Sequence, residues 1–149
     1  MAAQVRNYTV TPNVGTGALL LPSVPQTLSN GATQSFAVST LQGYGIVSIS
    51  GCGGALNGAT YTTGAIVADC TVSVSATLRN GRSTGTEPSI SDALRTLTIK
   101  DGTYVPMPEE RVRYDVAPLD ANGNPVGNGI IDLADVIIIL RRVVGIGTW

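Results

Sequence analysis

The stretch NGIIDLAD at Asn128–Asp135 decides the second half of the fold, and it runs directly into the apolar segment VIIILRR at Val136–Arg142. A calcium ion takes about six to eight oxygen ligands, and one type of loop supplies them from positions 1, 3, 5, 7, 9 and 12, with glycine at position 6. The pattern predicts the end of such a loop followed by a helix. With Asp135 at position 12, the other positions fall on Asp132 (9), the Ile130 carbonyl (7), Gly129 (6) and Asn128 (5).

The start of this loop is less regular. Counting back without gaps puts Val126 at position 3, and valine has no side-chain oxygen. We therefore expect an insertion, with Asp115 at position 1 and Asp120 or Asn122 at position 3. The alternative is that Asp132 and Asp135 only cap the helix, because free N–H groups and the helix dipole stabilise carboxylates there. The predicted metal ligands are Asp115, Asp120, Asn128, Ile130, Asp132 and Asp135.

The composition argues against several classes of function. The net charge of −1 over 149 residues offers no attraction to nucleic acid or to anionic membranes. The chain has no histidine, which is the commonest general base and a frequent zinc ligand. A glycosidase needs two carboxylates beside a cleft, and Asp69 is the one acidic residue before Arg79. We therefore expect no catalytic activity.

The cysteines bear on location. Cys52 and Cys70 are either separate buried thiols of a cytosolic protein or one disulfide of a secreted protein. Their even number, the glycine-rich sequence between them and the Ser/Thr-rich surroundings favour the disulfide and an extracellular or cell-surface location. No apolar run reaches the roughly 18 residues of a membrane helix. The first residues lack the layout of a signal peptide, so we expect a removed signal or the tail of a longer protein.

Charged residues divide the chain into two parts. Arg6 and Asp69 are the only charged residues up to Leu78, whereas 17 follow from Arg79 to Trp149. Such a change indicates a domain boundary. We expect one domain over residues 1–79 and a second over residues 80–149.

The first half shows the alternation of half-buried strands. In TVSVSATL at 71–78, apolar residues alternate with serine and threonine, and Asn30-Gly31 and Asn57-Gly58 are turn signals. The same half contains the motifs YTVTP (8–12), GATQSF (31–36), YGIV (44–47), GCGG (51–54), YTTG (61–64) and DCTV (69–72). By these motifs, residues 7–78 resemble the divergent internalin-type B-repeat of bacterial surface proteins, which implies a compact β-grasp-like domain with a spacer or adhesive role.

The second half changes to helical spacing. Apolar residues follow both Asp92 and Asp135 at helical intervals, and the two segments superpose with an offset of 43 residues. The segment PMPEERV at 106–112 predicts a loop that leads into a short helix, with proline and two glutamates near its start.

Two loop-helix repeats joined by a linker resemble a type I dockerin over roughly residues 80–149. The resemblance implies two antiparallel helices, calcium-dependent folding and docking to a cohesin module, as in extracellular polysaccharide-degrading assemblies. It places partner-binding residues at Leu133, Ala134, Leu140 and Arg141. The equivalents in the first repeat, Ile90, Ser91, Leu97 and Thr98, differ from these, so we expect no second binding mode.

The first repeat is poorer in ligands. Gly81 and Gly85 stand where side-chain oxygens are needed, so we expect no tight calcium site there. Asp92 is then either a cap of its helix or a remnant of a once-functional repeat. We expect Val136, Ile137 and Leu140 to pack on the helix of the first repeat, which leaves Ile138 or Ile139 to face another surface.

Together these patterns predict an α+β fold of two domains. A small antiparallel, β-grasp-like domain is followed by an all-α, dockerin-like pair of loop-helix (F-hand) repeats. The predicted function is that of a non-catalytic C-terminal module of a secreted or cell-surface bacterial protein, stabilised by calcium and bound to a cohesin-like partner. The alternative is a structural or adhesive surface module whose helical pair packs permanently on the β-domain. We expect a monomer in isolation.

Overall fold

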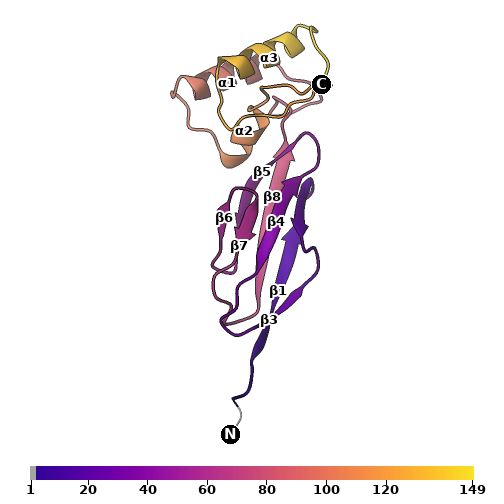
Figure 1. The fold of residues 1–149 in the computed structure, drawn as a ribbon. Coiled ribbons are helices and arrows are strands. Elements are labelled where there is room, and N and C mark those ends of the chain that lie inside the picture. The colour runs from indigo at the N-terminus through magenta and orange to yellow at the C-terminus, as the bar shows by residue number, and fades with distance from the viewer. Residues whose placement is uncertain (1–2) are drawn as a thin grey trace. The chain divides into compact units, whose positions relative to one another are not determined.

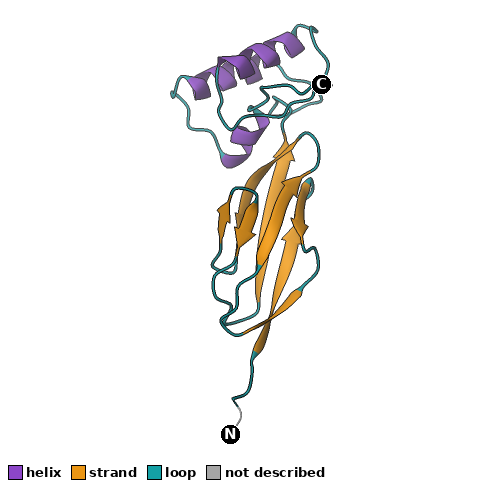
Figure 2. Cartoon of the chain, viewed as in Figure 1, coloured by secondary structure: helices purple, strands orange, loops and turns teal. Residues whose placement is uncertain are grey.

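The computed structural model describes residues 3–149, and the chain separates into two compact units. The first unit comprises the residues up to Leu41 together with Ser48–Ala76, and the second comprises Gln42–Val47 and Thr77–Trp149. Strands dominate the first unit, and the second carries all helices found in the described residues (Figures 1 and 2). Strands hold 31% of the residues and helices 19%, so the chain is mostly β.

One sheet is mixed, with four strands in the order β3-β1-β8-β5. Strand β1 (Asn7–Val14) pairs antiparallel with β3 (Gln26–Ser29) and parallel with β8 (Cys70–Leu78). Strand β5 (Tyr44–Ser50) lies beside β8. The sheet therefore joins segments that are about 60 residues apart in the sequence, since Val10 stands opposite Cys70.

The other sheet is antiparallel, with the order β2-β4-β7-β6. Its strands are β2 (Ala18–Leu21), β4 (Ser35–Thr40), β7 (Thr60–Thr62) and β6 (Ala55–Asn57). A turn through Asn57 and Gly58 connects β6 to β7, and Gly58 has a φ of 60°, as the asparagine-glycine signal predicts.

Alternate side chains of both sheets form the core of the first unit. In β8, Val72 and Val74 are buried while the serines beside them are more exposed, so the predicted alternation is confirmed there. The most deeply buried side chains of this unit include Val10, Leu20, Phe36, Tyr61 and Val72, each exposed by 2% or less.

The predicted fold class is wrong in both halves. The β part is not one small antiparallel β-grasp-like sheet but two four-stranded sheets, one of which is mixed. The second part is not an all-α pair of loop-helix repeats, because it has three short helices and includes the ends of β5 and β8. The alternation of apolar residues fixes which face of a strand is buried, but it does not fix which strand lies beside it.

The predicted disulfide between Cys52 and Cys70 is confirmed, with a Cα–Cα distance of 5.5 Å. It ties the turn after β5 to the start of β8. Gly51, next to Cys52, has a φ of +117°, and a Cβ there would collide with the carbonyl oxygen of Thr71. Only glycine allows this close backbone approach.

The second unit contains α1 (Ile90–Lys100), α2 (Pro108–Arg113) and α3 (Leu133–Val143). Helices α1 and α3 pack against each other over a core that includes Ala93, Tyr114, Val116 and Ile139. The predicted short helix in the linker is confirmed as α2, which begins at a proline. Within residues 3–149 no helix has the length and apolar character needed to cross a membrane.

Candidate functional site

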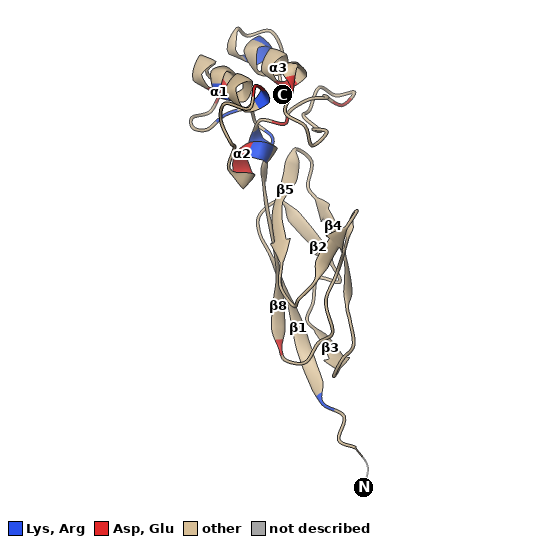
Figure 3. Ribbon diagram, turned by 90° about the vertical axis from the view of Figure 1, so that its left-hand side faces the viewer, with Lys and Arg blue, Asp and Glu red and all other residues tan. Residues whose placement is uncertain are grey.

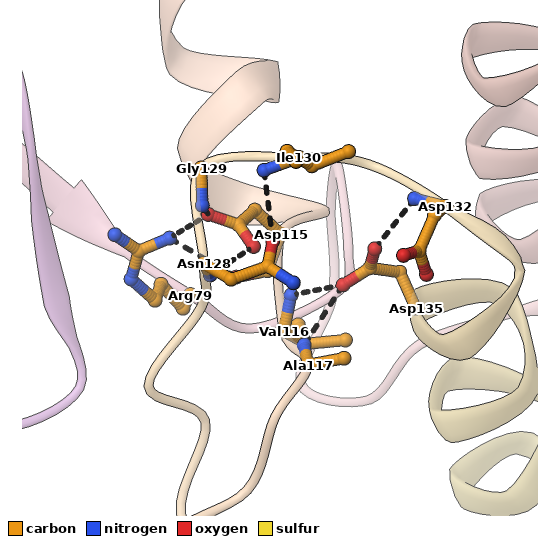
Figure 4. A network of polar contacts seen from close by, with 9 residues as sticks. All are labelled: Arg79, Asp115, Val116, Ala117, Asn128, Gly129, Ile130, Asp132 and Asp135. Atoms are coloured by element: carbon orange, nitrogen blue, oxygen red, sulfur yellow. Dashed lines mark hydrogen bonds and ion pairs between the residues drawn. The ribbon is translucent and has the colours of Figure 1, made fainter.

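The candidate site is the segment between α2 and α3, which contains most of the charged residues predicted to bind calcium. Charged residues are concentrated in the helical unit, as the coloured ribbon in Figure 3 shows. The segment brings two of the predicted ligands, Asp115 and Asp135, near each other in the interior (Figure 4), where they are exposed by 2% and 0%.

Asp115 is held by a cation and by backbone donors. Nη1 of Arg79 lies 2.6 Å from Oδ2 of Asp115 and also donates to the Asp115 carbonyl at 3.1 Å. The backbone N–H of Asn128 donates to Oδ1 and that of Gly129 to Oδ2, both at 2.9 Å. Each oxygen of this carboxylate therefore accepts at least one hydrogen bond from the protein.

The carboxylate of Asp135 is held by three backbone N–H donors. The N–H groups of Val116 and Ala117 donate to its Oδ1, and that of Asp132 donates to its Oδ2, all at 2.8 Å. Burial raises the pKa of Asp135, the repulsion from Asp115 adds to the rise, and these three hydrogen bonds oppose it. The side chain thus connects the start of α3 to the chain that follows α2.

The other predicted ligands point elsewhere. Asp120 turns back on its own loop and accepts from the N–H groups of Asn122 and Asn124. Oδ1 of Asn128 accepts from the N–H of Ile130, which is exposed. Asp132 is the N-cap of α3 and accepts from the N–H of Ala134 at 2.7 Å. Asp132 and Asp135 both take part in a capping box at the start of α3, which are the contacts that the capping alternative predicts.

These residues, as placed, do not fit a calcium ion. Calcium needs about six to eight oxygens that converge at roughly 2.3–2.6 Å. The carboxylates of Asp115 and Asp135 face N–H donors, and those of Asp120 and Asp132 lie in separate turns. No group of three or more His, Cys, Asp or Glu side chains in residues 3–149 is placed to hold a metal. Calcium binding stays a prediction from the sequence, and this geometry does not support it.

The first repeat has the same construction. Asp92 is 3% exposed, and its Oδ2 accepts from the backbone N–H and the hydroxyl of Ser89, the N-cap of α1. Its Oδ1 accepts from the N–H of Ser83 and from the hydroxyl of Tyr114. Burial opposes the charged form of Asp92, but these hydrogen bonds outweigh it and lower the pKa. The predicted cap at Asp92 is confirmed, and the N-caps Ser89 and Asp132 keep the offset of 43 residues.

Arg79 is the functional residue that the sequence reasoning missed. The sequence pattern marks it only as the first charge after the boundary, yet its side chain is 17% exposed and pairs with a buried aspartate. A buried carboxylate normally has a charged or hydrogen-bonded partner. Arg79 is the first charge after an almost uncharged stretch, but this position gives no indication that its partner is Asp115.

A second feature of the unit is an apolar outer surface on α1 and α3. On α3, Leu133, Ile137, Leu140 and the C-cap Val144 follow one helical face. On α1, Ile90 and Leu94 are the equivalents of Leu133 and Ile137. We call these six residues the apolar stripes, and each is exposed by 40–66%.

The predicted packing of α3 is partly wrong. Val136 is buried as expected, but Ile137 and Leu140 are exposed, and the completely buried apolar residue of α3 is Ile139. The predicted partner-binding residues Leu133, Ala134, Leu140 and Arg141 are all exposed. The helix turns Val136, Ile139 and Val143 inward, at intervals that place them on one face.

Comparison with protein-family models, with curated proteins and with solved structures gave no match.

Proposed function

We propose that this chain is a non-catalytic docking module of a secreted or cell-surface bacterial protein, and that the apolar stripes form its partner-binding surface. The disulfide is compatible with an oxidising compartment. A module of this kind needs a firm scaffold and an exposed recognition surface, and both features are present in the helical unit.

The observation that carries the proposal is the equivalence of the exposed residues in the two helices. Leu133 and Ile137 of α3 correspond to Ile90 and Leu94 of α1 under the offset of 43 residues. All four are large and apolar, and all four are exposed by 48–62%. Folding alone gives no reason for exposed leucine and isoleucine to recur at equivalent positions, whereas exposed apolar patches are typical of interaction surfaces.

The charges beside the stripes indicate the chemistry of the partner. Arg141 is exposed one position after Leu140, and Arg95 is exposed one position after Leu94. We therefore propose a protein partner with an apolar patch and carboxylates at its rim, because complementary rim charges favour association. A cohesin-like module, the partner implied by the sequence resemblance, is the first candidate.

The test is a binding titration of the full chain with a panel of cohesin modules, measured by calorimetry. We expect Leu133→Asp and Ile137→Asp to weaken binding by at least about 30-fold, since a residue at the centre of an interface commonly contributes about 2 kcal/mol. The matched control is Val105→Asp, at a position that is 78% exposed but lies outside the helices.

The other outcomes are equally informative. Equal losses for Val105→Asp and Ile137→Asp would contradict a specific surface on α3. Sedimentation of the free chain as a dimer, lost in Ile137→Asp, would identify a second copy as the partner. Protection of the Leu133 and Ile137 methyl groups from a soluble paramagnetic probe, in a monomer that binds no cohesin, would favour the structural or adhesive module instead.

A further inference from the structure

The ion pair between Arg79 and Asp115 involves the residue that is predicted to open the calcium loop. We infer that Arg79 supplies, from within the chain, the positive charge that a calcium ion would supply, so that the helical unit folds without a divalent cation. This inference is independent of the proposed docking function.

Arg79 places a positive charge against the residue predicted at the first position of the loop. A single nitrogen, Nη1, approaches both the carboxylate and the main-chain carbonyl of Asp115. Asp115 is almost completely buried, and burial of a carboxylate without a compensating charge is costly. Arg79 provides that charge permanently, because a guanidinium group stays protonated.

Gly127 makes room for this arrangement. Its φ is +71°, and a Cβ at this position would collide with Nη1 of Arg79 and would lie 2.6 Å from Oδ2 of Asp115. The backbone of the loop thus passes directly over the ion pair, where only glycine fits. The space beside Asp115 is filled by the guanidinium and by this backbone.

Asp135 and Asp92 give a second, independent line of evidence. Both occupy the last position of a predicted loop, where a calcium loop needs a ligand. Oδ1 and Oδ2 of Asp135 instead accept three backbone N–H groups, and those of Asp92 accept two backbone N–H groups and two hydroxyls. The same solution in both repeats indicates that neither aspartate is reserved for an ion.

The first experiment measures thermal unfolding of the full chain with a chelator and with millimolar calcium. Trp149, the only tryptophan, packs against the core of the helical unit and reports on its unfolding by fluorescence. We expect the same midpoint in both conditions, because a ligand that does not bind the folded state cannot stabilise it. A lower midpoint with the chelator, or a calorimetric heat of calcium binding, would overturn the inference.

The second experiment removes the internal cation. We expect Arg79→Met to lower the midpoint by roughly 10 °C, because it leaves Asp115 buried without its charged partner. The control Arg111→Met removes an exposed arginine of α2 in the same unit, and its midpoint should move little. Equal effects of the two substitutions would contradict a special role for Arg79.

Two further variants separate the charge of Arg79 from its packing. Arg79→Lys keeps a cation, so its midpoint should lie between those of the wild type and Arg79→Met. The double variant Arg79→Met/Asp115→Asn removes both charges and should recover part of the loss, since a neutral amide needs no counter-charge. A double variant no more stable than Arg79→Met, with Arg79→Lys equally unstable, would show that Arg79 acts through packing alone.

Discussion

At the scale of single residues, the helical unit is organised by three buried aspartates. Asp92, Asp115 and Asp135 are each exposed by 3% or less, and every one of their carboxylate oxygens accepts a hydrogen bond. Ionised groups in the interior require such partners. In this unit, acidic side chains therefore link loops to the starts of helices through hydrogen bonds. The sequence pattern predicted metal ligands at these positions.

The hydrogen bond from Tyr114 to Asp92 can be tested through the pH dependence of stability. Burial, together with the hydrogen bond to Asp92 and the charge of Asp92, raises the pKa of Tyr114 to about 12 from an ordinary value of 10. A folded-state pKa above the unfolded one gives stability that is complete below pH 10 and is lost as the pH rises towards 12. The free energy of unfolding of the wild type should therefore fall at high pH. We expect Tyr114→Phe to reduce this fall by about 1 kcal/mol or more.

The measurement is urea unfolding between neutral pH and pH 11, with the tyrosinate absorbance recorded in parallel. Tyr61→Phe is the control, because Tyr61 is also buried but donates to the Gly51 carbonyl in the first unit. If Tyr114→Phe and the wild type lose stability equally over this range, the link between Tyr114 and Asp92 does not contribute as stated.

At the scale of elements, α3 has one buried and one exposed apolar face. Two of its isoleucines, two positions apart, lie on different faces. Ile139 is 0% exposed and belongs to the core cluster with Ala93 and Tyr114, whereas Ile137 is 48% exposed. The run of apolar residues from Val136 to Leu140 hides this division, since its sequence is apolar on every side.

We expect Ile139→Ala to lower the free energy of unfolding by about 2–5 kcal/mol, because it opens a cavity in a closed core. Ile137→Ala, the same change two positions earlier, should cost less than about 1 kcal/mol, since the removed atoms are half in water. Urea unfolding followed by Trp149 fluorescence measures both. Similar costs for the two variants would mean that Ile137 is covered in solution.

The sequence predicted individual elements better than their arrangement. The strand at Thr71–Leu78, the turn at Asn57–Gly58, the short helix at Pro108 and the caps of α1 and α3 follow from local patterns, and all are present. Local hydrogen bonds and burial determine such features, so they can be recognised in a short window.

The pairing of β1 with β8 and the ion pair of Arg79 with Asp115 could not be predicted in this way. The first joins residues 60 positions apart and the second residues 36 positions apart. Both depend on which segments meet after the whole chain has collapsed. A pattern that fixes a buried face, or an isolated charge, carries no information about its distant partner.

At the scale of the whole molecule, the strand-rich unit is stabilised by a covalent link and not by buried carboxylates. The disulfide between Cys52 and Cys70 closes a loop with a sequence separation of 18 and anchors β8, whose neighbours in the sheet are β1 and β5. Almost no charged residues contribute here, since Arg6 and Asp69 are the only ones before Arg79. The unit therefore depends on its apolar core and on this one covalent link.

The double variant Cys52→Ser/Cys70→Ser should lose about 3 kcal/mol of unfolding free energy, because opening the loop restores conformational freedom to the unfolded chain. The far-ultraviolet circular dichroism of the strands, followed in urea, measures this loss. Reduction of the wild type should reproduce it, and the same reductant should leave the double variant unchanged, which separates loss of the link from loss of the two side chains. A wild-type midpoint that does not move on reduction would show that the pairing of β8 with β1 and β5 holds this strand without the covalent link.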